Sequence, residues 1–367
     1  MALARRAALI ALVAGLLLAV LATPAFAHGR GSDATNFSSR IRSAPDVPGV
    51  SWQIYGGDEL LGLTNTSDRE VLVLGYEDEP YLRVGPDGVF LNRNSLATYQ
   101  NADRYGRVEV PPEVDPDAEP VWDRVGDGNR YLFHDHRIHY MAFVLPPAIA
   151  AAPGEPHEVL EWTVPFQVDG GPQQEVTGDL RWVPGASPWP WLLGALVVTL
   201  PALAGLRTSP TADDRWPGLA RPAALVLGVL AALNVFHLVD DLFAVPLPWP
   251  AILLSAGQTA MFILIAVLGA VRGWQARDGA FTAIGVGAAA LFIGQGLLYL
   301  SVLMTSQNAS LVPELFSRAV VAASIVAILP LGAVAVTGTR RLLPDYDEAE
   351  DAEAVATPTP DSATTTP

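Results

Sequence analysis

Hydrophobic and polar positions alternate in the first half of the chain and merge into long apolar runs in the second half. Between residues 28 and 188, short stretches rich in valine, leucine and aromatic residues are separated by turns such as GPDG at 85–88. Short runs of this kind between glycine-rich turns are typical of the strands of a β-sandwich. The expected strands lie at residues 50–55, 70–76, 80–84, 158–168 and 177–183.

The second half of the chain has the pattern of a membrane protein. An α-helix needs about 20 apolar residues to cross the hydrocarbon core of a bilayer. Five runs reach or approach that length, at approximately Trp189–Leu206, Pro222–Val245, Ala251–Val271, Ala280–Met304 and Leu315–Thr337. The pattern therefore predicts an all-β sandwich followed by an all-α bundle of five transmembrane helices.

The N-terminus predicts export of the β-domain. Residues 1–27 combine a basic start, an apolar run and an A-x-A box at 25–27, which together are typical of a secretory signal peptide. An uncleaved anchor is the alternative, and the well-placed A-x-A box disfavours it. Cleavage there makes His28 the first residue of the mature chain. The expected parts are a signal peptide (1–27), an extracytoplasmic β-sandwich domain (28–188), a transmembrane domain (189–342) and a disordered acidic tail (343–367).

The arginines set the expected orientation in the membrane. In the second half of the chain, the arginines lie mainly between the first and second apolar runs, between the third and fourth, and after the fifth. The two remaining loops carry no basic residue. By the positive-inside rule, the arginine-bearing loops are cytoplasmic. We therefore expect a multi-pass protein of the cell (plasma) membrane, embedded in the lipid bilayer with the β-domain outside and the C-terminal tail in the cytoplasm.

Composition excludes several classes of function. The chain has no cysteine, so it forms neither disulfides nor thiolate metal sites. A formal net charge of −16 argues against nucleic-acid binding, which needs a basic surface. No hydrolase elbow, phosphate loop or zinc-protease motif is present. The sequence therefore favours a binding or structural protein over an enzyme.

The segment HDHRIH at 134–139 holds three of the six histidines in the chain. In a regular strand, His134 and His136 would point to one face, and Asp135 and His139 to the other. The mature N-terminal His28 could chelate a metal through its α-amine and its imidazole together.

Such a nitrogen-rich set suits Cu(II), because nitrogen ligands favour copper over the other divalent first-row ions. The four methionines and the lack of cysteine argue against a dedicated Cu(I) site. In the alternative interpretation, the histidines are hydrogen-bonded at the domain surface, and Asp135 pairs with Arg137 or Arg130.

The second unusual segment is NVFHLVDDLF, in the outer half of the second apolar run. His237, Asp240 and Asp241 share one helical face, and ionisable groups inside membranes usually mark pathways or sites. One interpretation is a second metal or proton-relay site that uses His237 and Asp240. In the other, an aspartate pairs with Arg318 to hold the bundle together. An intramembrane enzyme is disfavoured, because adjacent aspartates on a helix point about 100° apart.

The end of the β-domain, FQVDGGPQQEVTGDLRWVPG at 166–185, resembles the last two strands of CopC-type copper-binding domains. Those domains are small immunoglobulin-like β-sandwiches that begin with a histidine after signal cleavage, as His28 would. The resemblance implies a CopC-like fold and extracytoplasmic Cu(II) binding or delivery. The family's Asp-Gly-His reads Asp169-Gly170-Gly171 here, so one ligand histidine of the family is absent. The whole chain also resembles uncharacterised bacterial membrane proteins that share HDHRIH-like and PWPWL segments.

Two functions therefore remain open. In the first, the exported domain binds copper through His28, His134, His136 and either Asp135 or His139, and passes it to a metal-handling partner protein. In the second, the exported domain binds a protein partner without metal, and the bundle anchors it or transmits a signal.

Overall fold

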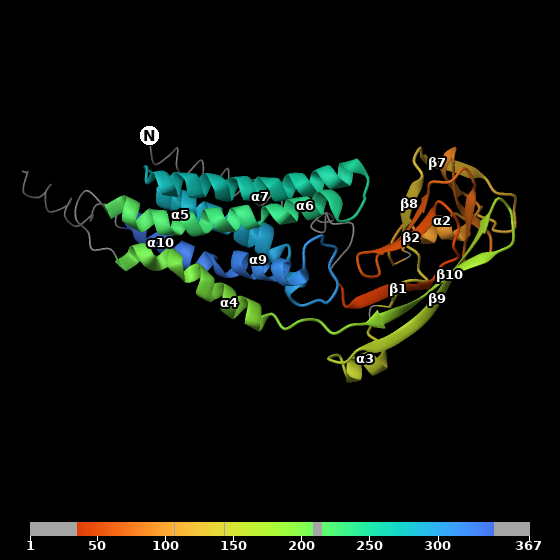
Figure 1. Ribbon diagram of the computed structural model, residues 1–367, viewed down its shortest axis with the longest axis horizontal. Helices are drawn as coiled ribbons and strands as arrows, with labels where there is room; N and C mark the ends of the chain where they lie inside the picture. The colour runs from red at the N-terminus through yellow and green to blue at the C-terminus, as the bar shows by residue number, and fades with distance from the viewer. Residues whose placement is uncertain (1–34, 106, 143, 208–214, 341–367) are drawn as a thin grey trace, which may run out of the picture. The chain divides into compact units, whose positions relative to one another are not determined.

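A computed structural model describes residues 35–105, 107–142, 144–207 and 215–340 (Figure 1). The expected signal peptide, His28 and the expected acidic tail lie outside these residues. Along the described chain, ten strands come first, and the long apolar helices begin at Trp189. The predicted order of a β-region followed by a helical region is confirmed.

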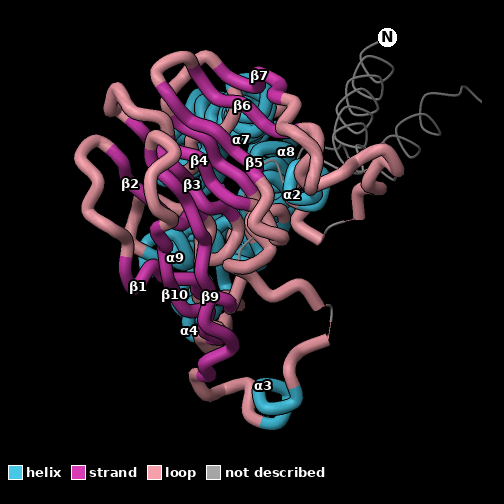
Figure 2. The backbone as a smooth tube through the Cα atoms, turned by 90° about the vertical axis from the view of Figure 1, so that its right-hand side faces the viewer, coloured by secondary structure: helices cyan, strands magenta, loops and turns pink. Residues whose placement is uncertain are grey.

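The strands form two antiparallel sheets, drawn in magenta in Figure 2. The larger sheet contains, in spatial order, β1 (Phe37–Ser43), β10 (Gln174–Trp182), β9 (His157–Val168), β4 (Val71–Leu74), β5 (Pro80–Gly85), β6 (Gly88–Asn92) and β7 (Trp122–Gly126). The smaller sheet contains β2 (Val50–Tyr55), β3 (Leu60–Asn65) and β8 (Arg130–Phe133). Each of the five sequence segments expected as strands overlaps one of these strands.

One cluster of buried side chains draws on both sheets. In β9, Trp162, Val164 and Phe166 are buried, whereas the intervening Thr163 is exposed, as expected for a strand with one face on a core. Leu61 of the smaller sheet belongs to the same cluster and is fully buried. Burial of this apolar surface is the main force that holds the two sheets together.

Two short helices interrupt the β-region, α2 (Leu96–Gln100) and α3 (Pro147–Ala151). The helical region contains α4 (Trp189–Thr199), η1 (Leu200–Arg207), α5 (Arg215–Leu233), α6 (Val235–Phe243), α7 (Trp249–Gln275), α8 (Ala280–Leu291), η2 (Phe292–Leu297), η3 (Leu300–Leu303), α9 (Glu314–Val326) and α10 (Ile328–Arg340). Consecutive helices combine into five segments, within the described residues, that are long and apolar enough to cross a membrane. The 27 residues of α7 alone extend about 40 Å, more than the ~30 Å of a hydrocarbon core.

Four of the five spans are interrupted, which hydropathy did not predict; the first changes from α4 to the 3-10 helix η1 at Leu200. The second span breaks at Asn234, between α5 and α6, and the fifth breaks at Ala327, between α9 and α10. The fourth span was expected to run from Ala280 to Met304, but after α8 it changes to the π-helical η2. Asn234 is fully buried and donates from Nδ2 to the carbonyl oxygen of Leu230 at 2.8 Å and to Oγ of Ser324 at 3.0 Å. These bonds satisfy a polar side chain inside the bundle, and they depend on tertiary neighbours.

Contacts divide the described chain into two compact units. The first contains the β-region to Trp191 together with Phe236–Ala260 and Leu298–Val321. The second contains Leu192–Val235, Met261–Leu297 and the residues from Ala322 onward. Both polar sites considered below lie in the first unit.

Candidate functional site

The HDHRIH segment is a turn that follows β8, and it is not a strand. The last residue of β8, Phe133, pairs with Leu61, and the amide of Ile138 then donates to the carbonyl oxygen of Asp135 at 3.0 Å. The alternation of faces expected for a strand therefore does not apply here. Because a turn does not alternate its side chains, the positions of the three histidines are set by individual contacts.

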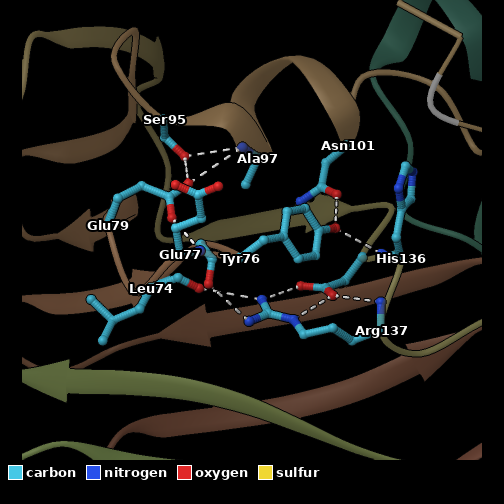
Figure 3. A network of polar contacts seen from close by, with 11 residues as sticks. Leu74, Tyr76, Glu77, Glu79, Ser95, Ala97, Asn101, His136 and Arg137 are labelled. Carbon is cyan, nitrogen blue, oxygen red and sulfur yellow. Dashed lines mark hydrogen bonds and ion pairs between the residues drawn. The ribbon is translucent and has the colours of Figure 1, made fainter. Parts of the chain in front are cut away.

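Asp135 and Arg137 form a buried ion pair. Asp135 is fully buried, and its carboxylate accepts from Nε of Arg137 at 2.8 Å and from the second guanidinium nitrogen at 2.7 Å. The same guanidinium donates to the carbonyl oxygens of Leu74 and Gly75, each at 3.3 Å (Figure 3). Burial alone would lower the pKa of Arg137, but the adjacent charge of Asp135 raises it above its ordinary value. The alternative in which Asp135 pairs with Arg137 is the arrangement that the structure contains.

A tyrosine ties this turn to α2. The hydroxyl of Tyr76 donates to Oδ1 of Asn101, at the end of α2, and accepts the backbone N–H of His136 at 2.9 Å (Figure 3). The guanidinium carbon of Arg137 lies 5.1 Å from the centre of the Tyr76 ring. Burial is the main reason why the pKa of Tyr76 is raised, so the hydroxyl keeps its proton and stays a donor.

Glu79 fixes the start of α2. It is almost fully buried, and its Oε1 accepts from Oγ of Ser95 at 2.6 Å, while its Oε2 accepts the amide of Glu77 at 2.9 Å. Ser95 caps the helix by accepting from the amide of Ala97 at 3.2 Å. Together with Tyr76, this network holds the loop after α2 beside the histidines. No local pattern predicts this network, because its members lie in three separate segments of the chain, at 76–79, 95–101 and 136.

That loop places Arg104 among acidic side chains. The guanidinium bonds both carboxylate oxygens of Asp58 at 3.0 and 3.1 Å, and it also pairs with Glu59. Asp58 is fully buried. Burial raises the pKa of its carboxyl group, although the charge of Arg104 opposes the shift.

The three histidines of the segment lie around this charge cluster. Nδ1 of His134 lies 2.9 Å from the carbonyl oxygen of Glu59, and Nε2 of His136 lies 3.1 Å from that of Asp103. His139 is 1 % exposed, and its ring centre lies 5.3 Å from that of His136.

Burial and Arg104 keep two of these imidazoles neutral. Burial is the largest cause of the lowered pKa of His134. For His139, burial, then the charge of Arg104 and then the other two histidines lower the pKa to about 3. Both rings therefore offer a lone pair at neutral pH. Nδ1 of His139 is buried, and it has no hydrogen-bond partner among the described residues.

The intramembrane segment forms a second polar site. His237 is 2 % exposed, and its ring stacks on Tyr299 with centres 4.4 Å apart. Asp240 accepts from Oγ of Ser310 at 2.7 Å and from the amide of Leu311 at 2.8 Å. The two residues thus lie on one face of α6, as predicted, but they bond to different elements.

Asp241 and Arg318 also have partners that the sequence did not indicate. Oδ2 of Asp241 accepts from the hydroxyl of Thr259 at 2.6 Å, and the hydroxyl of Tyr299 lies 3.4 Å away. Arg318 pairs with Glu314, one turn away on α9, at 2.9 Å. The expected pairing of Arg318 with an aspartate of α6 is replaced by this pair, because Glu314 is within reach on the same helix.

No family model, curated protein or solved structure matches the chain. Within the described residues, no group of three or more histidine, aspartate and glutamate side chains has the arrangement of a metal site. The structure thus brings His134, His136 and His139 into one cluster, commits Asp135 to Arg137, and places His237 and Asp240 in a separate site. His28 lies outside the described residues, so a copper site completed by the N-terminus stays a prediction.

Proposed function

We propose that the chain is a membrane-anchored extracytoplasmic protein that binds or delivers a metal ion, copper, through the histidines of HDHRIH. The observation that carries the proposal is that His134, His136 and His139 lie in one turn, with His134 and His139 held neutral by burial and by Arg104, and with Nδ1 of His139 buried and unused among the described residues. Metal ions bind imidazole only in its deprotonated form, so protons do not compete with a metal for these rings near neutral pH.

The proposed ligands are His134, His136 and His139, with the amine and imidazole of His28 completing the site. The ring nitrogens of His134 and His136 now contact carbonyl oxygens, so metal binding requires small rotations of half-buried side chains. Asp135 is better suited to positioning than to ligation, because its oxygens already bond to Arg137. It fixes the turn that presents the histidines on either side of it.

We infer the orientation and the fold type as part of this proposal. The arginine-bearing loops support, by the positive-inside rule, an orientation with the β-region outside the membrane. The buried cluster shared by the two sheets supports an immunoglobulin-like or CopC-like sandwich. Under this orientation, the histidine cluster is exposed to extracytoplasmic metal. The proposed function is binding or delivery and includes no catalytic step.

The test is a competition titration with Cu(II), on the full chain in detergent and exported so that His28 is its first residue. Replacing both His134 and His136 by asparagine is expected to weaken Cu(II) binding by about 10-fold or more, since even second-shell changes have effects of that size. His157→Asn is the matched control, because His157 begins β9 and its ring contacts the carbonyl oxygen of Ala152, just after α3, outside the histidine turn. Equal affinities of the double variant and the wild type would exclude the cluster as the copper site.

A second candidate function is a signalling module that binds a protein partner, and a set of contacts within the first unit favours it. Thr35 and Gln307 form a β-bridge, and Ser306 donates to the side chain of Asn36 and to the carbonyl oxygen of Val183. These residues lie just before β1 and just after β10, which are adjacent because the two strands are antiparallel, so the segment is bonded to one end of the larger sheet's edge pair.

The same segment continues to Ser310 and Leu311, which bond to Asp240 of α6. Under this alternative, a partner that displaces the edge of the sheet would also displace this segment and so change the contacts of α6. Under this alternative, Asp240→Asn would abolish the response to a partner, and the double histidine variant would leave it intact. Under the metal-binding proposal, the double histidine variant weakens Cu(II) binding, and Asp240→Asn leaves it unchanged.

A further inference from the structure

The loop between the histidine turn and β9 carries an exposed apolar segment, residues 144–153, with the sequence VLPPAIAAAP, which we call the apolar arm. The arm contains α3, on a loop that projects from the strands (Figure 2). Val144 is 77 % exposed. The other exposed residues of the arm are Pro147, Ala148, Ala150, Ala151 and Pro153. Contiguous exposed apolar surface marks a site of contact with a protein or a membrane.

Charged residues are absent from the arm and from the sequence around it. No aspartate, glutamate, lysine or arginine occurs from residue 138 to residue 154, although the chain has a formal net charge of −16. The arm also has no side chain that donates or accepts a hydrogen bond. Its surface is therefore apolar throughout, and it offers nothing that a polar partner could recognise.

The backbone of the arm is suited to an environment without water. The amide of Ala150 donates to the carbonyl oxygen of Pro146 at 2.9 Å, which closes the turn of α3. Three of the arm's residues are prolines, which have no N–H group. Because an unpaired amide is costly to move out of water, few free N–H groups oppose the transfer of the arm into an apolar phase.

The C-terminal end of the arm is tied to the start of the first span. Nε1 of Trp182 donates to the carbonyl oxygen of Pro153 at 2.9 Å, and Trp182 also pairs with His157 of β9. The first span begins at Trp189. Seven residues of extended chain cover at most about 25 Å. This tether keeps the end of the arm within that distance of the membrane surface.

We infer that the apolar arm inserts into the interfacial layer of the bilayer that surrounds the five apolar spans. A lipid surface binds through apolar area and needs no specific hydrogen bonds. A protein partner fits less well, because the arm lacks the Trp, Tyr and Arg side chains that carry most of the binding energy at protein interfaces.

The inference goes beyond the proposed function and does not rest on it, since no proposed metal ligand lies in the arm. The two are nevertheless connected by position. The histidine turn ends at His139, five residues before the arm begins. Insertion of the arm would thus hold the turn within about 20 Å of the membrane surface.

The test uses the full chain in nanodiscs of pure phosphatidylcholine. Because the chain has no cysteine, a single introduced cysteine carries a nitroxide spin label at a known position. Ala150→Cys and Val144→Cys, in separate proteins, place the label on the arm. Thr163→Cys is the matched control, because Thr163 is exposed on β9 outside the arm. Leu253→Cys on α7, where the side chain is 64 % exposed, is the reference for contact with lipid.

Power saturation then compares how often each label collides with oxygen, which concentrates in the bilayer, and with a water-soluble nickel complex. The ratio of oxygen to nickel accessibility at both arm positions is expected to exceed the ratio at Thr163 and to approach that at Leu253. A ratio equal to that at Thr163 would overturn the inference, because the arm would then lie in water. Low accessibility to both reagents would overturn it as well, because a protein partner or a second copy of the chain would then cover the arm.

Discussion

The ion pair between Asp135 and Arg137 should be the most sensitive point of the histidine turn. In Arg137→Met, a fully buried carboxylate loses both of its guanidinium bonds, which are 2.7 and 2.8 Å long. Breaking a buried pair by removing one partner destabilises a protein by about 3–5 kcal/mol, because an uncompensated charge stays buried. We expect a loss of stability in that range.

The matched control is Arg69→Met. Arg69 also bonds an aspartate through Nε, at 2.7 Å from Asp169, but the side chains of this pair are 45 % and 50 % exposed. Exposed pairs contribute about 0–1 kcal/mol. The double variant Asp135→Asn/Arg137→Met should recover part of the loss, because it removes the buried charge.

Hydrogen exchange followed by mass spectrometry on the full chain in detergent measures these differences. The amides of β4 and β8 flank the pair, and their free energy of opening should fall by about 3–5 kcal/mol in Arg137→Met. A fall no larger than that of Arg69→Met would refute the reasoning that the pair is buried and essential for the turn.

Three further predictions concern other contacts. The folded-state pKa of His139, about 3, lies below its ordinary value of 6.5, so the stability contributed by its neutral form is present above pH 6.5 and is lost as pH falls towards 3. At pH 5 the protein should be about 2 kcal/mol less stable than at pH 7 for this reason. Acid-denaturation curves of His139→Gln should lack this loss. Tyr76→Phe removes the donor to Asn101 and an acceptor for a backbone amide, and it should destabilise the turn by about 1–3 kcal/mol in the same exchange measurement. Asp240→Asn weakens its two bonds to Ser310 and Leu311, in the loop that precedes the fifth span, so amides at 305–314 should exchange faster while those of β9 stay unchanged.

Hydrophobic pattern was sufficient to predict the main elements. Strands were expected at 50–55, 80–84 and 158–168, and β2, β5 and β9 match these bounds within one residue. The five apolar spans were also predicted. These features follow from local periodicity and run length, which depend on neighbouring residues only.

The contacts of the histidine cluster could not be predicted in the same way. Arg104 reaches the histidines because Glu79 and Tyr76 hold α2 and the loop after it. These residues are far apart in the sequence, and the sequence does not predict how the loops between them bring them together. The break at Asn234 likewise depends on Ser324, which is 90 residues away. Met141 follows His139 by two residues, but only the turn geometry shows that its sulfur meets the ring.

The central claim, that the histidine cluster binds copper, is tested most directly by pulsed electron paramagnetic resonance of the full chain with one equivalent of Cu(II). The histidines are labelled with ¹⁵N, and the wild type is compared with a variant that carries one extra residue before His28. A third protein lacks His134 and His136. The account predicts that the Cu(II) electron spin couples to at least two imidazole nitrogens in the wild type. These couplings should be lost in the variant without His134 and His136 and altered by the residue added before His28. A spectrum without imidazole coupling, or one identical in all three proteins, would contradict it.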